Sequence, residues 1–213
     1  MRSAQLALVG ALTACLFLVG LVLDMDWLRL ATKPWPVLAM AAWVWPNGDR
    51  RVAWGLIFGA LGDICLAIHG AFLTGMLAFA IGHGLYVKAF FSWQRSLSLS
   101  LLFSVLIFLA ITVPITLPSN GELTIPVAIY MSIIGLMIWR AAAVAADESV
   151  NGMRRWSALI GATLFAFSDT LIGINKFNTP LPSASYAIIL LYWGGQAFIA
   201  AAAVGRAKQF TAP

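Results

Sequence analysis

The sequence predicts an all-α, polytopic transmembrane bundle of about eight spans, and two properties of the chain lead to that class. Its 213 residues are 62% hydrophobic and only 10% charged, whereas soluble domains carry roughly 25% charged residues. The mean hydropathy of +0.92 comes from repeated apolar stretches close to the roughly 20 residues that cross a bilayer as a helix. We expect residues 1–213 to form a single transmembrane domain.

The spans follow one another with short connections. The candidate segments are 5–23, 28–45, 52–68, 71–91, 98–117, 123–146, 156–174 and 184–205. The second is irregular, because Arg29, Lys33, Pro34 and Pro36 lie near its start. It is either a full span with an irregular first turn or a re-entrant piece. In the first segment, "LTAC" resembles a lipoprotein processing site, but the apolar run continues to Leu23 and favours an uncleaved helix.

The basic residues orient the predicted bundle, because cytoplasmic loops are enriched in Lys and Arg. With eight spans, three basic residues face one side, namely Arg29, Lys33 and Lys176. Ten face the other, namely Arg2, Arg50, Arg51, Lys88, Arg95, Arg140, Arg154, Arg155, Arg206 and Lys208. We therefore expect both termini in the cytoplasm and the protein in the cell (inner) membrane. If the second segment does not cross, only the N-terminus changes side.

Other protein classes fit the composition poorly. The basic residues are scattered in short loops, which argues against a nucleic-acid partner. Cys15 and Cys65 lie in apolar segments and form no disulfide or metal pattern. We find no Walker-type or dinucleotide glycine motif, so no cofactor is expected. The oligomeric state is left open.

Three ionisable residues are enclosed by apolar runs: Asp63, His83 and Asp169. Each costs roughly 2.5–3.5 kcal/mol or more at the bilayer centre, so such residues mark functional sites. Helical rise places all three at mid-membrane or in the outer half, within about 8 Å of one another in depth. Asp63 and His83 lie on an antiparallel hairpin and can face each other. The alternative is structural: a buried pair that fixes helix register, with Asp169 in polar contacts between helices.

Further polar side chains lie at similar depth and are candidates for substrate binding. They are Lys33, Tyr86, Tyr130, Tyr192 and Gln196. His83 and Tyr86 are three residues apart, and Tyr192 and Gln196 four apart, so each pair shares a helix face. Taken singly, the tyrosines are better explained by packing, and Lys33 is most simply a side chain that reaches the membrane interface.

Two carboxylates and a histidine at one depth suit acid–base chemistry. A pair of carboxyl groups flanking one bond can cleave an acetal-like C–O linkage, with one protonated and the other ionised. The histidine could hold one carboxylate ionised or relay protons. One central histidine with two aspartates is a poor zinc site, so no metal is expected. The rival class is a proton-coupled transporter of a small molecule or lipid, because intramembrane carboxylates also form proton relays.

A weak internal echo relates "FGALGDICLAI" (58–68) to "IGATLFAFSDTLIGI" (160–174). Both read Gly-Ala, then Asp, then Leu or Ile, and both predicted spans run in the same direction. The echo is compatible with two parallel four-helix halves. Chance similarity in a chain this rich in Gly, Ala and Leu explains it equally well.

Several segments together resemble the YhhN-like family of lysoplasmalogenases. They are "KPWP" in the second span, "GDICLA" in the third, "GMLAFAIGHGLYVKAF" in the fourth, "GATLFAFSDTLIGINKF" in the seventh and "YWGGQAFI" in the eighth. The resemblance covers most of the chain in the same order. It implies a membrane-embedded hydrolase that cleaves the vinyl-ether bond of lysoplasmalogens into a fatty aldehyde and a glycerophospho-ethanolamine or -choline. The expected partners are thus a lysophospholipid substrate and membrane lipids.

With this resemblance, Asp63 and Asp169 are expected to share the acid and water-orienting roles, and His83 to tune one of them. Tyr86, Tyr130, Tyr192 and Gln196 would bind polar parts of the substrate. Lys33 would meet the headgroup phosphate. Which aspartate is the acid is left open.

Overall fold

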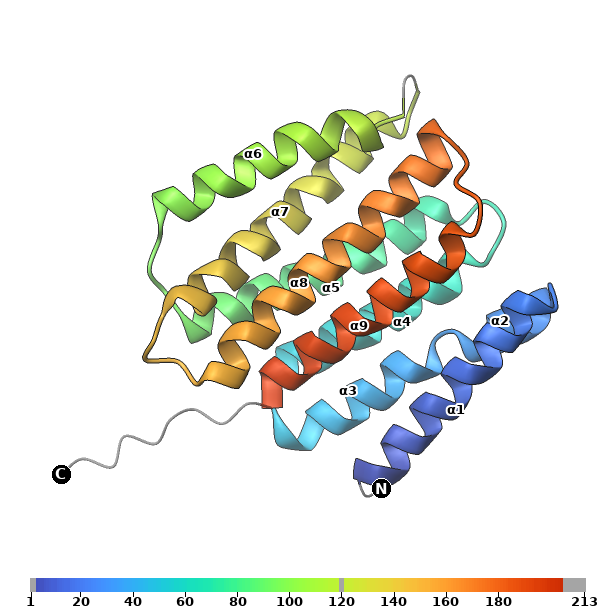
Figure 1. The fold of residues 1–213 in the computed structure, drawn as a ribbon, viewed down its shortest axis with the longest axis horizontal. Helices are drawn as coiled ribbons and strands as arrows, with labels where there is room; N and C mark the ends of the chain where they lie inside the picture. Colours follow the sequence, from blue (N-terminus) through green and yellow to red (C-terminus); the bar gives the residue numbers. More distant parts are fainter. Residues whose placement is uncertain (1–2, 119–120, 205–213) are drawn as a thin grey trace.

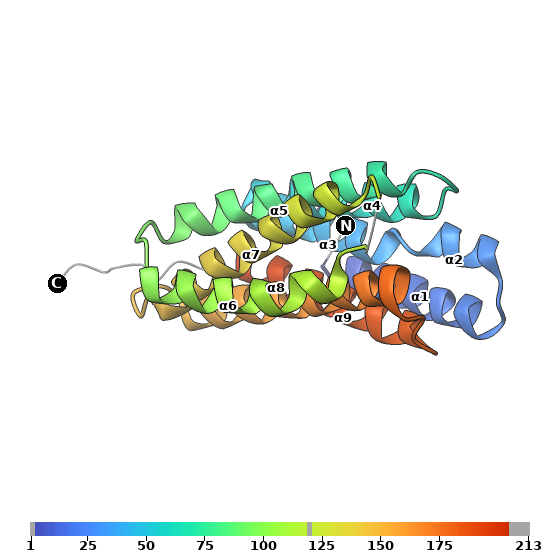
Figure 2. The same ribbon diagram turned by 90° about the horizontal axis from the view of Figure 1, so that it is seen from above.

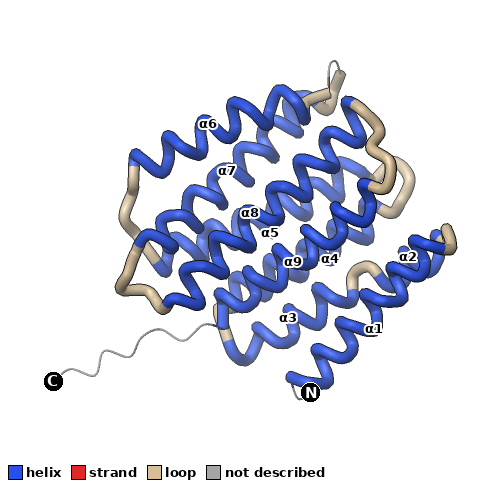
Figure 3. Tube along the Cα trace, in the orientation of Figure 1, coloured by secondary structure: helices blue, strands red, loops and turns tan. Residues whose placement is uncertain are grey.

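A computed structural model describes residues 3–118 and 121–204. Their helices are α1 (Ser3–Val22), α2 (Asp26–Thr32), α3 (Trp35–Asn47), α4 (Arg50–Leu66), α5 (Phe72–Trp93), α6 (Leu99–Thr116), α7 (Thr124–Ala146), α8 (Gly152–Gly173), the π-helical segment η1 (Ile174–Asn178) and α9 (Ala184–Val204). Only helices and loops occur in these two ranges (Figure 3). Arg2, Arg206 and Lys208, used above to orient the chain, lie outside them.

The prediction of an all-α membrane bundle is confirmed. Within the described residues, five helical stretches are long and apolar enough to cross a membrane: α1, α5, α7, α8 with η1, and α9. The chain is therefore a multi-pass membrane protein. The other expected spans correspond to shorter or less regular helices, such as α4 with 17 residues, so the number eight stays a prediction.

The irregular second span is two helices rather than one. The 7-residue α2 ends at Thr32, and the 13-residue α3 begins at Trp35. Pro34 and Pro36 have no backbone N–H to continue the helical hydrogen bonds, so the helix breaks between these ends. The break leaves Lys33 at the joint, from which its side chain reaches into the bundle.

The helices lie roughly side by side (Figure 1). Seen from above, α4 and α5 form one face, while α6, α8 and α9 lie on the other, with α7 reaching between them (Figure 2). The hairpin of α1 and α2 packs at one edge and α6 at the opposite edge (Figure 1). Two antiparallel hairpins, α4–α5 and α8–α9, therefore enclose the centre. A relation between them by internal repeat stays a prediction.

Glycines allow the α8–α9 hairpin to close tightly. A Cβ added at Gly161 would lie 2.8 Å from the carbonyl oxygen of Gly195, and one at Gly195 would lie 3.0 Å from that of Gly161. Backbone atoms cannot yield to such a contact. Because small residues let membrane helices approach closely, this pair fixes the distance between the helices that carry Asp169 and Tyr192.

The turn between α3 and α4 is fixed by Asp49. The segment 46–51, "PNGDRR", contains the end of α3 at Asn47 and the start of α4 at Arg50. Asp49 caps α4, because its carboxylate accepts a hydrogen bond from the Arg51 backbone N–H at 3.0 Å. It also accepts one from the Trp93 indole at 3.0 Å, which ties the start of α4 to the end of α5.

Candidate active site

Asp63 is a buried carboxylate with two partners from distant parts of the chain. It lies on α4 and is only 2% exposed. Its Oδ1 is 3.0 Å from the Lys33 ammonium, and its Oδ2 accepts a hydrogen bond of 2.7 Å from the Tyr192 hydroxyl. Buried charges require this kind of pairing. The carboxylate thus joins the α2–α3 break, α4 and α9.

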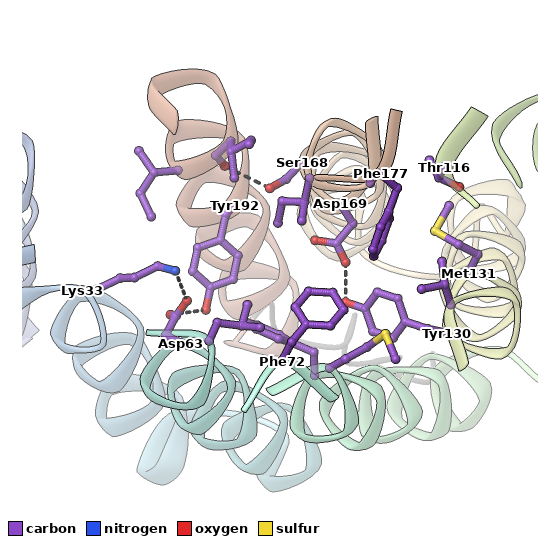
Figure 4. Close-up of a pocket in the computed structure, with 18 residues that line it drawn as sticks. Lys33, Asp63, Phe72, Thr116, Tyr130, Met131, Ser168, Asp169, Phe177 and Tyr192 are labelled. Carbon is purple, nitrogen blue, oxygen red and sulfur yellow. Dashed lines mark hydrogen bonds and ion pairs between the residues drawn. The ribbon is translucent and has the colours of Figure 1, made fainter. Parts of the chain in front are cut away.

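Asp169 lies on α8 and is half-buried. The Tyr130 hydroxyl, on α7, donates a hydrogen bond to its Oδ2. In Figure 4, the other carboxylate oxygen points toward the side where Asp63 and Tyr192 lie. Among the described residues, Asp169 has no direct ion-pair partner. Each carboxylate therefore accepts a hydrogen bond from its own tyrosine, Tyr192 for Asp63 and Tyr130 for Asp169, but only Asp63 has a cationic partner.

Both carboxylates line one cavity, together with Lys33, Tyr130 and Tyr192 (Figure 4). The rest of the wall is mostly apolar and comes from α4 to α9, with Leu66, Phe72, Met76, Phe79, Val127, Met131, Ile172 and Phe177 among its side chains. A few convergent polar groups in an apolar cavity are typical of small-molecule sites. Of the predicted site residues, this cavity brings together Asp63, Asp169, Lys33, Tyr130 and Tyr192.

His83 does not face Asp63 as we expected from the hairpin. Its ring packs edge-on against Phe165, with centroids 4.4 Å apart, and lies 5.6 Å from the Tyr130 ring. It is 1% exposed, and neither ring nitrogen has a hydrogen-bond partner in the described part of the chain. Helical rotation explains the difference, because equal depth leaves the direction of a side chain open. His83 lies behind Tyr130, outside the cavity wall.

Tyr86 and Gln196 form a buried pair of their own. The Tyr86 hydroxyl donates a 2.7 Å hydrogen bond to Gln196 Oε1, and neither residue is among those that line the cavity. A Cβ at Gly59 would lie 2.8 Å from Gln196 Nε2 and 3.4 Å from Tyr192 Oη. The Gln196 amide and the Tyr192 hydroxyl thus border the same small space. The Tyr86–Gln196 pair therefore lies next to the Tyr192 hydroxyl, on the side away from the cavity.

Aromatic residues around the carboxylates were not singled out from the sequence. Phe79 packs edge-on against Tyr192 at 5.8 Å and against Phe165 at 6.1 Å. Phe177 reaches the cavity from η1, a π-helical segment of the kind often found at functional sites. In a chain with 13 phenylalanines, position alone could not separate these from lipid-facing ones.

Other chemistries have less support in this arrangement. The Ser168 hydroxyl donates to the Ile188 carbonyl at 3.0 Å, so it is engaged with α9 rather than with a base. Within residues 3–118 and 121–204, no group of three or more His, Cys, Asp or Glu side chains could hold a metal ion. The arrangement suits proton transfer between two differently compensated carboxyl groups.

The fold and this cavity define a polytopic membrane protein with two carboxylates at a buried site. The chain belongs to the YhhN family, whose model matches residues 28–203. It is 37% identical over 160 residues to bovine lysoplasmalogenase TMEM86A, covering 72% of this chain and 65% of that protein. It is 33% identical over 188 residues to human lysoplasmalogenase TMEM86B, covering 85% and 77%. No solved structure matches the chain significantly.

Proposed function

We propose that this protein is a membrane-embedded hydrolase that cleaves the vinyl-ether bond of lysoplasmalogens. The products are a fatty aldehyde and a glycerophospho-ethanolamine or -choline. One observation carries the proposal: Asp63 and Asp169 line a single cavity that is otherwise mostly apolar. Similarity to proteins named lysoplasmalogenases supports the same reaction. The apolar wall suits contact with an alkenyl chain, and the carboxylates offer the acid and base.

In the proposed reaction Asp169 is the general acid. Vinyl-ether hydrolysis begins when a proton is added to the β-carbon of the double bond, which leaves an oxocarbenium ion at the α-carbon. Asp169 has no direct ion pair among the described groups, and its free oxygen points into the cavity (Figure 4). A carboxyl group without a cationic partner in an apolar site is the one that retains a proton. Tyr130 holds its other oxygen in place.

Asp63 is then the ionised carboxylate of the two and acts as the base. Lys33 compensates its negative charge at 3.0 Å, which suits a group that stays ionised. Asp63 stabilises the oxocarbenium ion and accepts a proton from the attacking water. Tyr192 orients it through the 2.7 Å hydrogen bond. Such proton transfer by placed side chains contributes about 10²–10⁴-fold in rate.

The atoms of the proposed reaction balance with one water. Water adds to the α-carbon and forms a hemiacetal. Its collapse breaks the C–O bond to glycerol, so the glycerol oxygen takes the proton released by the hemiacetal hydroxyl. Asp63 returns the proton it accepted to Asp169 through the water in the cavity, and the enzyme is restored. The cycle uses no cofactor, redox step or metal.

His83, Tyr86 and Gln196 have positioning roles in this proposal rather than contact with substrate. His83 packs behind Tyr130, and the Tyr86–Gln196 pair lies beside the Tyr192 hydroxyl. The partners are a lysophospholipid and membrane lipids, with no nucleic acid. We further propose the cell (inner) membrane as location and cytoplasmic termini, on the distribution of basic residues.

Aldehyde release by the purified protein in detergent tests the proposal. A 1-alkenyl lysophospholipid should yield one fatty aldehyde for each glycerophospho product. The matched 1-alkyl lysophospholipid, which lacks the double bond, should be left intact. A transporter using the same carboxylates would release no aldehyde in detergent and would instead move a solute across liposomes. The absence of aldehyde with folded, detergent-solubilised protein would overturn the enzymatic assignment.

A further inference from the structure

A second cavity lies on the other side of the Lys33–Asp63 ion pair. It is bounded by the α1–α2 hairpin, α4 and α9, and it shares Lys33, Asp63, Ile188 and Ile189 with the cavity described above. Its other lining residues include Asp26, Trp27 and Arg29. The two cavities therefore share part of their walls. The second differs from the first in that α2 adds the Asp26, Trp27 and Arg29 side chains to its lining.

The second cavity borders an ion-paired cluster made of Arg29 and two aspartates. The Arg29 guanidinium is ion-paired with Asp26, and the Arg29 side chain is 27% exposed while that of Asp26 is 90% exposed. Asp24 lies 3.4 Å from the same guanidinium. The stem of Arg29 rests against α1, since a Cβ at Gly20 would lie 3.2 Å from Arg29 Cγ. Arg29 is thus held in place, whereas the exposed carboxylates are free to exchange partners.

We propose that this cavity is a subsite for a zwitterionic phospholipid headgroup, an assignment that rests on the proposed function. Arg29 takes the phosphate, because its planar fork matches phosphate oxygens in two hydrogen bonds. Asp26, released from Arg29, takes the ammonium of ethanolamine or choline. The Trp27 ring, which is 65% exposed, covers the cation, since tryptophan is the best aromatic partner for an ammonium.

The spacing along α2 fits the length of a lysolipid. Lys33 follows Arg29 by one helical turn, and its backbone N–H donates to the Arg29 carbonyl at 3.0 Å. One turn rises about 5.4 Å, which is close to the span of a glycerol backbone between its phosphate and its first oxygen. With the phosphate on Arg29, the ether oxygen reaches the level of Lys33 and Asp63. The alkenyl chain then continues into the first, apolar cavity.

The charges of this subsite should also make it prefer zwitterionic headgroups to anionic ones. A zwitterionic headgroup exchanges the Arg29–Asp26 ion pair for two pairs with the ligand, so both of these side chains keep a partner of opposite charge. A headgroup that ends in phosphate alone would leave Asp26 beside a second anion. Like charges placed together reject the wrong ligand. We therefore expect choline and ethanolamine lysolipids to bind more tightly than the headgroup-free phosphate monoester.

Kinetics of Arg29→Gln, Asp26→Asn and Trp27→Leu variants test the subsite. Arg29→Gln should raise KM for the choline and ethanolamine substrates at least about tenfold with little change in kcat. It should leave cleavage of 1-alkenylglycerol, which has no phosphate, unchanged. Asp26→Asn should bring the KM for choline lysolipid closer to the KM for 1-alkenylglycerol 3-phosphate. The matched control is Arg50→Gln, an exposed arginine that starts α4 and should keep wild-type KM values.

Binding without turnover keeps the test independent of catalysis. Titration with the uncleavable 1-alkyl lysophosphocholine should show at least about tenfold weaker binding to Arg29→Gln than to wild type. Glycerophosphocholine should compete with it at concentrations at which inorganic phosphate does not. Competition by inorganic phosphate alone would instead identify a simple anion site and overturn the headgroup assignment. An equal loss of activity of Arg29→Gln on 1-alkenylglycerol would also overturn this assignment, because Arg29 would then support the fold.

Failure of this subsite can be told apart from failure of the proposed function. If wild-type protein releases aldehyde but the three variants keep wild-type KM ratios among the substrates, the headgroup assignment is wrong and the hydrolase assignment stands. If wild-type protein cleaves no vinyl ether, the proposed function fails, and the binding titration alone decides whether the cavity holds a headgroup.

Discussion

Lys33 and Asp63 form an ion pair, with Nζ and Oδ1 3.0 Å apart, that joins the proline-broken second span to the last turn of α4. The Asp63 side chain is 2% exposed and that of Lys33 is 26% exposed. Lys33 therefore supplies the compensating charge from the more open side. The two residues also line both cavities. In our proposals the position of the ion pair marks where the scissile bond of the substrate lies.

Replacing Lys33 with methionine should destabilise the protein through Asp63. Breaking a buried ion pair leaves one charge unpaired and costs about 3–5 kcal/mol. Thermal unfolding in detergent should therefore shift to lower temperature. The double variant Lys33→Met with Asp63→Asn removes both charges, so it should regain most of this stability yet stay inactive. If the double variant unfolds as early as Lys33→Met, the ion pair is not the cause of the loss.

Asp63→Asn should abolish most aldehyde release while the protein still folds. The substitution preserves shape and removes the charge, so we expect a fall of about 10²–10⁴-fold in kcat. Size-exclusion chromatography and thermal unfolding check the fold. Glu148→Gln, at an exposed loop position before α8, is the matched control and should keep full activity. Near-wild-type kcat in Asp63→Asn would remove this residue from the mechanism.

Substitution of Asp169 should lower the activity of the protein more than substitution of Tyr130. Asp169→Asn removes the proposed acid and should lower kcat about 10²–10⁴-fold. Tyr130→Phe removes only the hydrogen bond that orients Asp169, so we expect a smaller loss of about 2–10-fold, near the worth of a hydrogen bond between neutral groups. Tyr186→Phe, at a partly exposed position on α9, is the control. A larger loss in Tyr130→Phe than in Asp169→Asn would contradict this order.

Gly161→Ala should destabilise the α8–α9 hairpin. The added methyl would lie 2.8 Å from the Gly195 carbonyl oxygen, and overpacking of this kind costs about 1–3 kcal/mol. Gly194→Ala is the matched control, because its methyl would meet only Leu164 Cδ1 at 3.6 Å. Thermal unfolding should fall for the first variant and stay near wild type for the second. Equal unfolding temperatures would show that the helices can shift apart at little cost.

The Asp49 carboxylate, at the α3–α4 turn, should make the stability of the protein depend on pH. Burial would raise its pKa, but hydrogen bonds from Arg51 and Trp93 outweigh burial and lower the pKa below the usual 3.8. The stabilisation is therefore present above pH 3.8 and lost as pH falls through the lower, folded-state pKa. Asp49→Asn should unfold earlier than wild type at pH 7, and this gap should shrink below pH 3.8. A gap independent of pH would exclude the carboxylate charge as its source.

The sequence alone determined the class of the protein and the costly groups within it. Composition and the length of the apolar runs led to an all-α membrane bundle, because helices satisfy their backbone hydrogen bonds internally in lipid. The same cost of burial in lipid marked Asp63, His83 and Asp169 as unusual. Pro34 and Pro36 also signalled the irregular second span, since proline interrupts helical hydrogen bonding in any context.

Only the tertiary structure decided which of these groups meet. Depth follows from helical rise, but the direction of a side chain depends on how each helix is rotated against its neighbours. That rotation turned Lys33 toward Asp63 and Tyr130 toward Asp169, and it turned His83 toward Phe165 instead. Helix rotation is set by side-chain packing between segments far apart in the sequence, such as Tyr192 and Asp63. No local pattern within one span contains that information.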